Sequence, residues 1–139
     1  MKLYFSKRLA LKYFACIASG IFLLTTNSIA QDVSGALVKF DAKWGEKCEK
    51  CEYYKGYERS FEDTYTVFFR NTSNVVIDAQ VAVQEDNLAW RVYQFKGIHP
   101  LDEISAYACR GTGKYYFWVK KENDPELKFP SEDEINSML

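Results

Sequence analysis

Three cysteines and the single histidine are the residues whose types and spacing could support chemistry in this chain. Cys48 and Cys51 form a Cys-x-x-Cys pair, and His99 and Cys109 follow later in the sequence. Thiolates and imidazoles are the preferred protein ligands of zinc, so these four side chains could form a Cys3His site. The Cys-x-x-Cys pair could also be a thiol redox centre, a haem attachment site or half of a structural disulfide.

The surrounding residues favour a disulfide. Covalent haem attachment requires a histidine directly after the second cysteine, where this chain has Glu52. A redox pair usually opens a helix in a βαβ unit, which the sequence does not predict. In an exported domain, a bond from Cys109 would close a loop of roughly 60 residues and stabilise by about 4 kcal/mol. We expect a Cys51–Cys109 bond, with Cys48–Cys109 as the alternative. We expect no cofactor, although a zinc or thiol-redox domain stays open.

The N-terminus has the three-part layout of a secretory signal peptide. Its start contains four basic residues and no acidic one, and residues 13–24 are apolar. Small residues at Ser28 and Ala30 then form a cleavage site before Gln31. We therefore expect a signal peptide over residues 1–30 and a single domain over residues 31–139. The protein would be secreted or periplasmic, and the basic start and Ala-Gln junction indicate a bacterial source.

The charge of the processed chain limits its partners. Removing the four basic residues of the signal peptide from eighteen Lys and Arg leaves fourteen, against nineteen Asp and Glu, a net charge of −5. An acidic chain is poorly suited to bind nucleic acid or an anionic membrane surface. No segment after residue 30 is long and apolar enough to predict a membrane span.

Alternating apolar and polar residues predict the elements that must position these side chains. The pattern favours strands near residues 36–44, 64–70, 75–84, 88–95, 103–110 and 114–121. Short polar links at residues 71–74 and 85–87 are typical of β-hairpins, and residues 111–113 predict a turn. Ser131 and Glu134 form a capping box that predicts a short C-terminal helix. We therefore expect an all-β fold, an antiparallel β-sandwich (immunoglobulin-like) or a small barrel, ending in this helix.

The same alternation predicts the faces of two strands. Val38, Phe40, Ala42 and Trp44 would share one face of their strand. In the strand near residues 75–84 one face carries only apolar side chains, namely Val75, Ile77, Ala79, Val81 and Val83.

Aromatic residues make up 17% of the chain and offer a candidate binding surface. Tyr116 and Trp118 share one face of the last predicted strand, and both of its faces are rich in aromatic side chains. One face must bury in the core, and the other is either covered by the C-terminal helix or free to bind a partner. We predict Tyr116, Trp118 and Trp90 as binding residues that contact a protein or a glycan.

Two segments resemble parts of known families. Residues 102–109, DEISAYAC, resemble the tyrosine corner that ends an immunoglobulin domain, although the Cys-then-Trp spacing of that family is missing. Residues 111–127 are similar to the tail of periplasmic lysozyme-inhibitor β-barrels. The second resemblance adds a further alternative, an inhibitor of a secreted hydrolase.

Catalytic motifs are missing from the sequence. There is no G-x-S-x-G elbow and no H-E-x-x-H pair, and His99 has no identifiable catalytic partner. The sequence therefore predicts an exported, non-enzymatic binding or structural domain.

Overall fold

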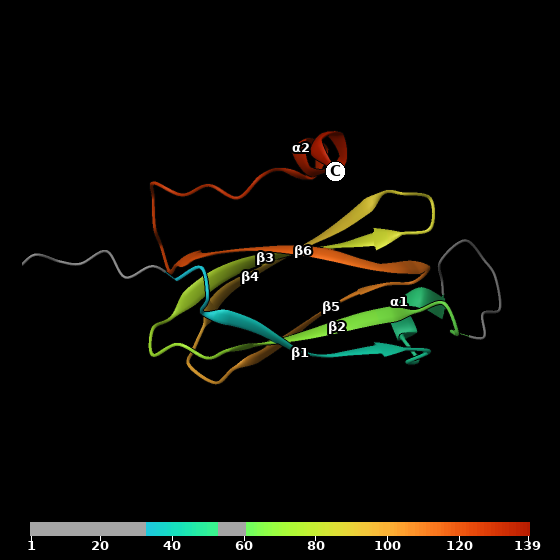
Figure 1. Ribbon diagram of the computed structural model, residues 1–139, viewed down its shortest axis with the longest axis horizontal. Helices are drawn as coiled ribbons and strands as arrows, with labels where there is room; N and C mark the ends of the chain where they lie inside the picture. The colour runs from blue at the N-terminus through green and yellow to red at the C-terminus, as the bar shows by residue number, and fades with distance from the viewer. Residues whose placement is uncertain (1–32, 53–60) are drawn as a thin grey trace, which may run out of the picture. The chain divides into compact units, whose positions relative to one another are not determined.

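The computed structural model describes residues 33–52 and 61–139, so the expected signal peptide lies outside the described residues. Within that part of the chain, the strands form two three-stranded antiparallel sheets packed as a β-sandwich, as the alternation predicts (Figure 1). The strands are β1 (Leu37–Trp44), β2 (Tyr65–Asn71), β3 (Ile77–Glu85), β4 (Trp90–Ile98), β5 (Glu103–Ala108) and β6 (Gly111–Lys121). Two short helices, α1 (Glu49–Glu52) and α2 (Glu132–Met138), complete the described elements.

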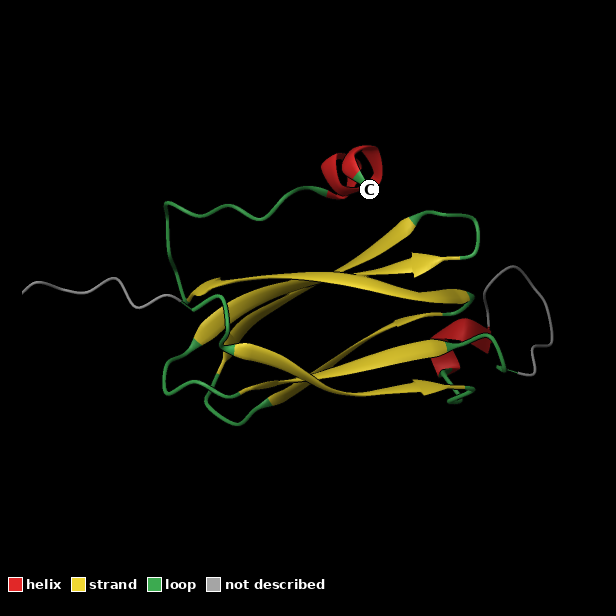
Figure 2. Ribbon diagram, in the orientation of Figure 1, coloured by secondary structure: helices red, strands yellow, loops and turns green. Residues whose placement is uncertain are grey.

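The two sheets have the strand orders β1-β2-β5, here sheet A, and β4-β3-β6, here sheet B (Figure 2). Among the described residues, the link from β3 to β4 joins neighbouring strands as a short hairpin, whereas β1 and β2, which are also neighbours, are joined by a long link that contains α1. The links that leave β2, β4 and β5 each carry the chain from one sheet to the other. The prediction of a hairpin at residues 71–74 is therefore wrong, because that link bridges the two layers.

Asn71 explains why the link after β2 leaves its sheet. Its side chain is fully buried, and its amide donates to the carbonyl oxygens of Val75 and Ile98, at 2.8 and 3.0 Å. Its Oδ1 accepts the backbone N–H of Ser73 at 3.0 Å. These bonds satisfy backbone groups that pass between the layers without ladder partners, which makes the crossing stable.

The link from β5 to β6 depends on a close approach. The chain turns at Cys109 and Arg110, and Gly111 already belongs to β6, so the predicted turn lies two residues too late. A Cβ atom at Gly111 would overlap the Cβ of Tyr65. The glycine is therefore needed to let β6 pass β2 on its way into sheet B.

The core lies between the sheets and follows the predicted alternation of β3. The side chains of Ile77, Ala79, Val81 and Val83 are all fully buried. They face Val67 and Phe69 of β2, among other residues of the same cluster. The ring of Phe69 lies 5.1 Å from the ring of Phe117 in β6, a separation typical of packed aromatic pairs.

In β1 the predicted face is wrong. Val38, Phe40, Ala42 and Trp44 do not share one face, because a β-bulge at Phe40 shifts the register of the pairing with β2. One extra residue reverses the inward and outward positions on either side of it. Val38 and Phe40 are 43% and 44% exposed, and Leu37 instead fills the core.

Helix α2 begins as the sequence predicts. Ser131 Oγ accepts the backbone N–H of Glu134, and Glu134 Oε2 accepts the backbone N–H of Ser131 at 2.7 Å. This capping box satisfies donors that the first turn would otherwise leave unpaired. The bond from the Ser131 backbone lowers the pKa of Glu134, so its carboxylate is charged at neutral pH.

Candidate binding surfaces

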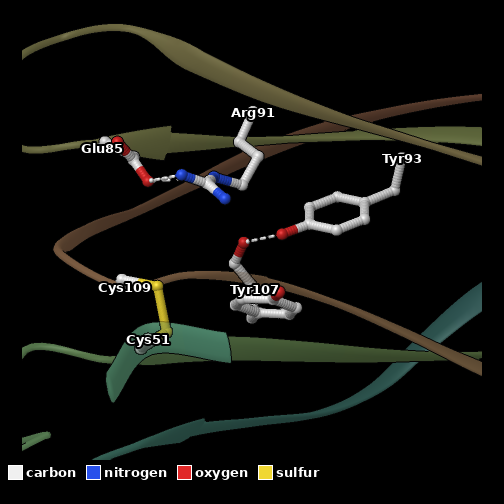
Figure 3. The surroundings of a disulfide bond; sticks show 6 residues. All are labelled: Cys51, Glu85, Arg91, Tyr93, Tyr107 and Cys109. Carbon is white, nitrogen blue, oxygen red and sulfur yellow. Dashed lines mark hydrogen bonds and ion pairs between the residues drawn. A yellow bond between two sulfur atoms is a disulfide. The ribbon is translucent and has the colours of Figure 1, made fainter. Parts of the chain in front are cut away.

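The structure joins Cys51 of α1 to Cys109, with 2.05 Å between the sulfur atoms (Figure 3). Both side chains are almost fully buried. The bond closes a loop with a sequence separation of 58 and ties α1 to the end of β5. Cys48 is the free cysteine of the described chain and is half-buried.

Polar contacts between neighbouring strands surround this bond (Figure 3). Tyr93 of β4 donates its hydroxyl to the carbonyl oxygen of Tyr107 in β5 at 2.7 Å, which links the edges of the two sheets. Burial and then the neighbouring Tyr107 raise the pKa of Tyr93, so its hydroxyl keeps its proton and acts as a donor. Arg91 donates to the buried carboxylate of Glu85 at 3.0 Å. The hydroxyl of Tyr93 and the charged groups of Arg91 and Glu85 therefore form hydrogen bonds that hold the strands together.

The four residues of the alternative metal site do not converge. Cys51 and Cys109 are bonded to each other, whereas His99 precedes β5 and Cys109 follows it. A strand of six residues spans roughly 20 Å, at about 3.3 Å per residue, so His99 lies at the opposite end of the sandwich. Within residues 33–52 and 61–139, no three His, Cys, Asp or Glu side chains gather in a way that could hold a metal ion.

The predicted aromatic residues lie on the outer face of sheet B, here the covered face. Trp90 of β4 pairs with Gln84 of β3. Tyr116 and Trp118 of β6 pair with Ala82 and Gln80 of β3. Helix α2 lies over this face (Figure 1). Its Ile135 is fully buried and packs with Ala82 and Trp90, while Trp118 packs against the same cluster.

Hydrogen bonds hold α2 and the segment before it against the covered face. Gln80 donates its side-chain amide to the carbonyl oxygen of Pro130 at 2.7 Å. Asn136 of α2 accepts the backbone N–H of Trp90 at 2.8 Å. Trp90 is only 3% exposed, and its indole N–H has no hydrogen-bond partner in the described chain. Of the three predicted binding residues, only Tyr116 is largely accessible, at 48%.

The outer face of sheet A, here the open face, carries aromatic side chains that the sequence analysis does not predict as binding residues. Phe40 and Phe68 lie 6.2 Å apart between ring centroids, beside the exposed Val38. No helix of the described chain covers this face (Figure 2). In the register of β1 and β2, Val38 pairs with Arg70 and Asp41 pairs with Phe68. The sequence could therefore predict which side chains share this face only if the bulge in β1 were already known.

Charged side chains surround the two rings of the open face. The Arg70 guanidinium lies 4.8 Å from the centroid of Phe40, and the Lys43 ammonium lies 5.1 Å from that of Phe68. Arg70 also pairs with Glu103, and Lys43 pairs with Glu46 at 3.3 Å. Cations over ring faces hold the aromatic side chains in place while leaving the apolar centre of the face exposed.

None of the helices in the described residues is long and apolar enough to cross a membrane. No protein-family model, curated protein or solved structure matches the chain.

Proposed function

We propose that this chain is an exported, non-enzymatic domain that binds a protein partner through the open face of sheet A. The observation that carries the proposal is the exposure of Val38 and Phe40 beside Phe68, on a sheet face that no described helix covers. Export is supported by the signal-peptide pattern and by the Cys51–Cys109 pair at disulfide distance.

The chemistry of the open face favours a protein over a glycan. Its centre is apolar, and its rim contains both signs of charge, with Lys43 and Arg70 paired to acidic neighbours. An apolar centre inside a polar rim, with aromatic and arginine side chains together, is typical of protein interfaces. Lys43 and Arg70 already pair with acidic neighbours, so these two side chains are less available to bind the hydroxyls of a sugar.

Site-specific photo-crosslinking in the native source tests this proposal. A photoreactive amino acid replaces Phe40 in one variant and Leu101 in a control, because Leu101 is 74% exposed but lies in the loop between β4 and β5. We expect one discrete adduct with another protein from position 40 and none from position 101. The identified partner should then bind the wild-type domain at least about tenfold more tightly than Phe40→Ser, a difference of roughly 1.4 kcal/mol.

Two results would contradict the proposal. Equal labelling from both positions would show that the open face has no preferred partner. An adduct between two copies of this chain would show that the open face binds a second copy of the chain and not another protein.

A further inference from the structure

A groove of about 560 Å³ opens between the outer face of sheet B and the segment that leads to α2. Asp78 of β3, Gln94 of β4 and Lys120 of β6 line one side, and residues 123–125 and 127–129 line the other. The segment is held over the sheet by the bond from Gln80 to Pro130 and by the Lys120 ammonium, which donates to the Asp124 carbonyl at 3.0 Å. The groove lies on a different sheet from the open face.

A largely buried ion pair lies in the wall of this groove. The side chains of Asp78 and Lys120 are 8% and 17% exposed, and Asp78 Oδ2 lies 4.0 Å from the Lys120 nitrogen. That separation is longer than a hydrogen bond. Asp78 Oδ1 accepts the backbone N–H of Gly97 at 3.0 Å, whereas Oδ2 has no partner at hydrogen-bonding distance in the described chain.

The spacing of this pair suits a hydroxyl group. A hydroxyl can accept a hydrogen bond from Lys120 and donate one to Asp78 at the same time, which neither a pure donor nor a pure acceptor can do. The two charges offset each other, so the pair gives no net attraction to an anionic or a cationic ligand. Lys96 and Lys128 also line the groove, but both are exposed and their charges are screened by water. The ion pair therefore favours a neutral, hydroxyl-bearing ligand.

The other walls of the groove fit the rest of a sugar ring. Phe129 is half-buried and Leu127 is exposed, and both line the groove, so they offer apolar surface to the C–H groups of a ring. The Lys120 ammonium lies 5.4 Å from the centroid of the Phe129 ring, and this contact fixes the position of the ring. Gln94 donates to Gln80 at 3.0 Å, and its own side-chain oxygen is left as an acceptor in the groove.

We propose that this groove binds a neutral monosaccharide or disaccharide, with a sugar hydroxyl bridging Asp78 and Lys120 and the ring packed against Leu127 and Phe129. Sites for small ligands combine apolar walls with a few placed polar groups in this way, in volumes of roughly 300–1,000 Å³. The site is independent of the partner-binding face.

Chemical-shift perturbation of the ¹⁵N-labelled domain tests this assignment. Glucose, galactose, mannose, N-acetylglucosamine and maltose are titrated separately to tens of millimolar. At least one should shift the amide signals of Gly97, Lys120 and Asp124, which contact the ion pair. Glucuronate, glucosamine and a fully O-methylated glucose serve as charged and hydroxyl-free controls, and they should produce at least fivefold smaller shifts.

Variants separate the proposed site from general surface binding. Lys120→Met should weaken the best sugar at least tenfold, and Phe129→Ala should weaken it severalfold with an unchanged spectrum elsewhere. Lys121→Met is the matched control, because its residue points to the opposite face of β6, and it should bind as the wild type does. The proposal is overturned if no sugar of the panel shifts these amides, if the shifts lie outside the groove, or if Phe129→Ala binds unchanged.

Discussion

The two outer faces of the sandwich carry similar apolar side chains, but those of one face are buried and those of the other are exposed. On the covered face, Ala82 and Trp90 lie beneath Ile135 of α2 and are excluded from water. On the open face, Val38 and Phe40 are each more than two-fifths exposed. Both faces carry outward-pointing apolar residues, so strand alternation alone does not distinguish them. The difference shows that α2 covers one apolar face, whereas no helix of residues 33–52 and 61–139 covers the other (Figure 2).

The cover on sheet B is small and depends on few contacts. Helix α2 has seven residues, of which Ile135 is the buried one. Isolated helices of this length are unstable in water, so α2 exists because its apolar residue packs on the sheet. The open face has no comparable cover in the described chain, and its sheet is instead tied by the bond between α1 and the end of β5.

The largest effect is expected from breaking the covalent tie of sheet A. Replacing both Cys51 and Cys109 by alanine should lower the free energy of unfolding by about 4 kcal/mol, because the unfolded chain regains the entropy of a long loop. Urea denaturation measures this change. Cys48→Ala is the control and should stay within about 0.5 kcal/mol of the wild type. An equal loss in Cys48→Ala would mean that the wrong cysteine has been assigned to the bond.

The next effect concerns the cover of sheet B. Ile135→Ala should lower the free energy of unfolding by about 2–3 kcal/mol, since a fully buried side chain is truncated and α2 loses its anchor. Trp90 should become accessible, so tryptophan fluorescence should shift to longer wavelength. Met138→Ala is the matched control in the same helix, because Met138 is 63% exposed. The covered face would not depend on α2 if the two variants had equal stability and emission.

The smallest effect is expected on the open face. Phe40→Ala should change the free energy of unfolding by less than about 1 kcal/mol, because its ring is already 44% exposed. Partner binding should nevertheless fall, as the crosslinking experiment predicts. A loss of stability as large as that of Ile135→Ala would show that Phe40 is a structural residue, and the contrast between the two faces would disappear.

Several features of the fold could be predicted because they depend on neighbouring residues. The alternation over residues 75–84 predicts the face of β3 that meets sheet A, where Ile77, Ala79, Val81 and Val83 are fully buried. The half-buried strand that such alternation predicts is nevertheless wrong, because all nine residues of β3 are buried. Ser131 and Glu134 predict the start of α2, because a capping box involves only residues three apart. The cover of an aromatic face by the C-terminal helix was one of two alternatives that the sequence left open.

Other features could not be predicted because they depend on distant contacts. The hairpin predicted after β2 is a crossing between layers, which Asn71 stabilises through the backbone of Ile98, far along the chain. The groove joins Asp78 and Lys120 to residues 123–129, for which the sequence predicts no helix or strand. No local pattern shows that these residues lie together.

The sequence by itself determined the all-β class, the position of most strands and the capped C-terminal helix, since each follows from side-chain alternation or from a hydrogen bond between near neighbours. Only the tertiary structure decided which aromatic face is covered. One inserted residue at Phe40 reverses the faces of β1, and the register against β2 that accommodates it is set by contacts between strands more than twenty residues apart.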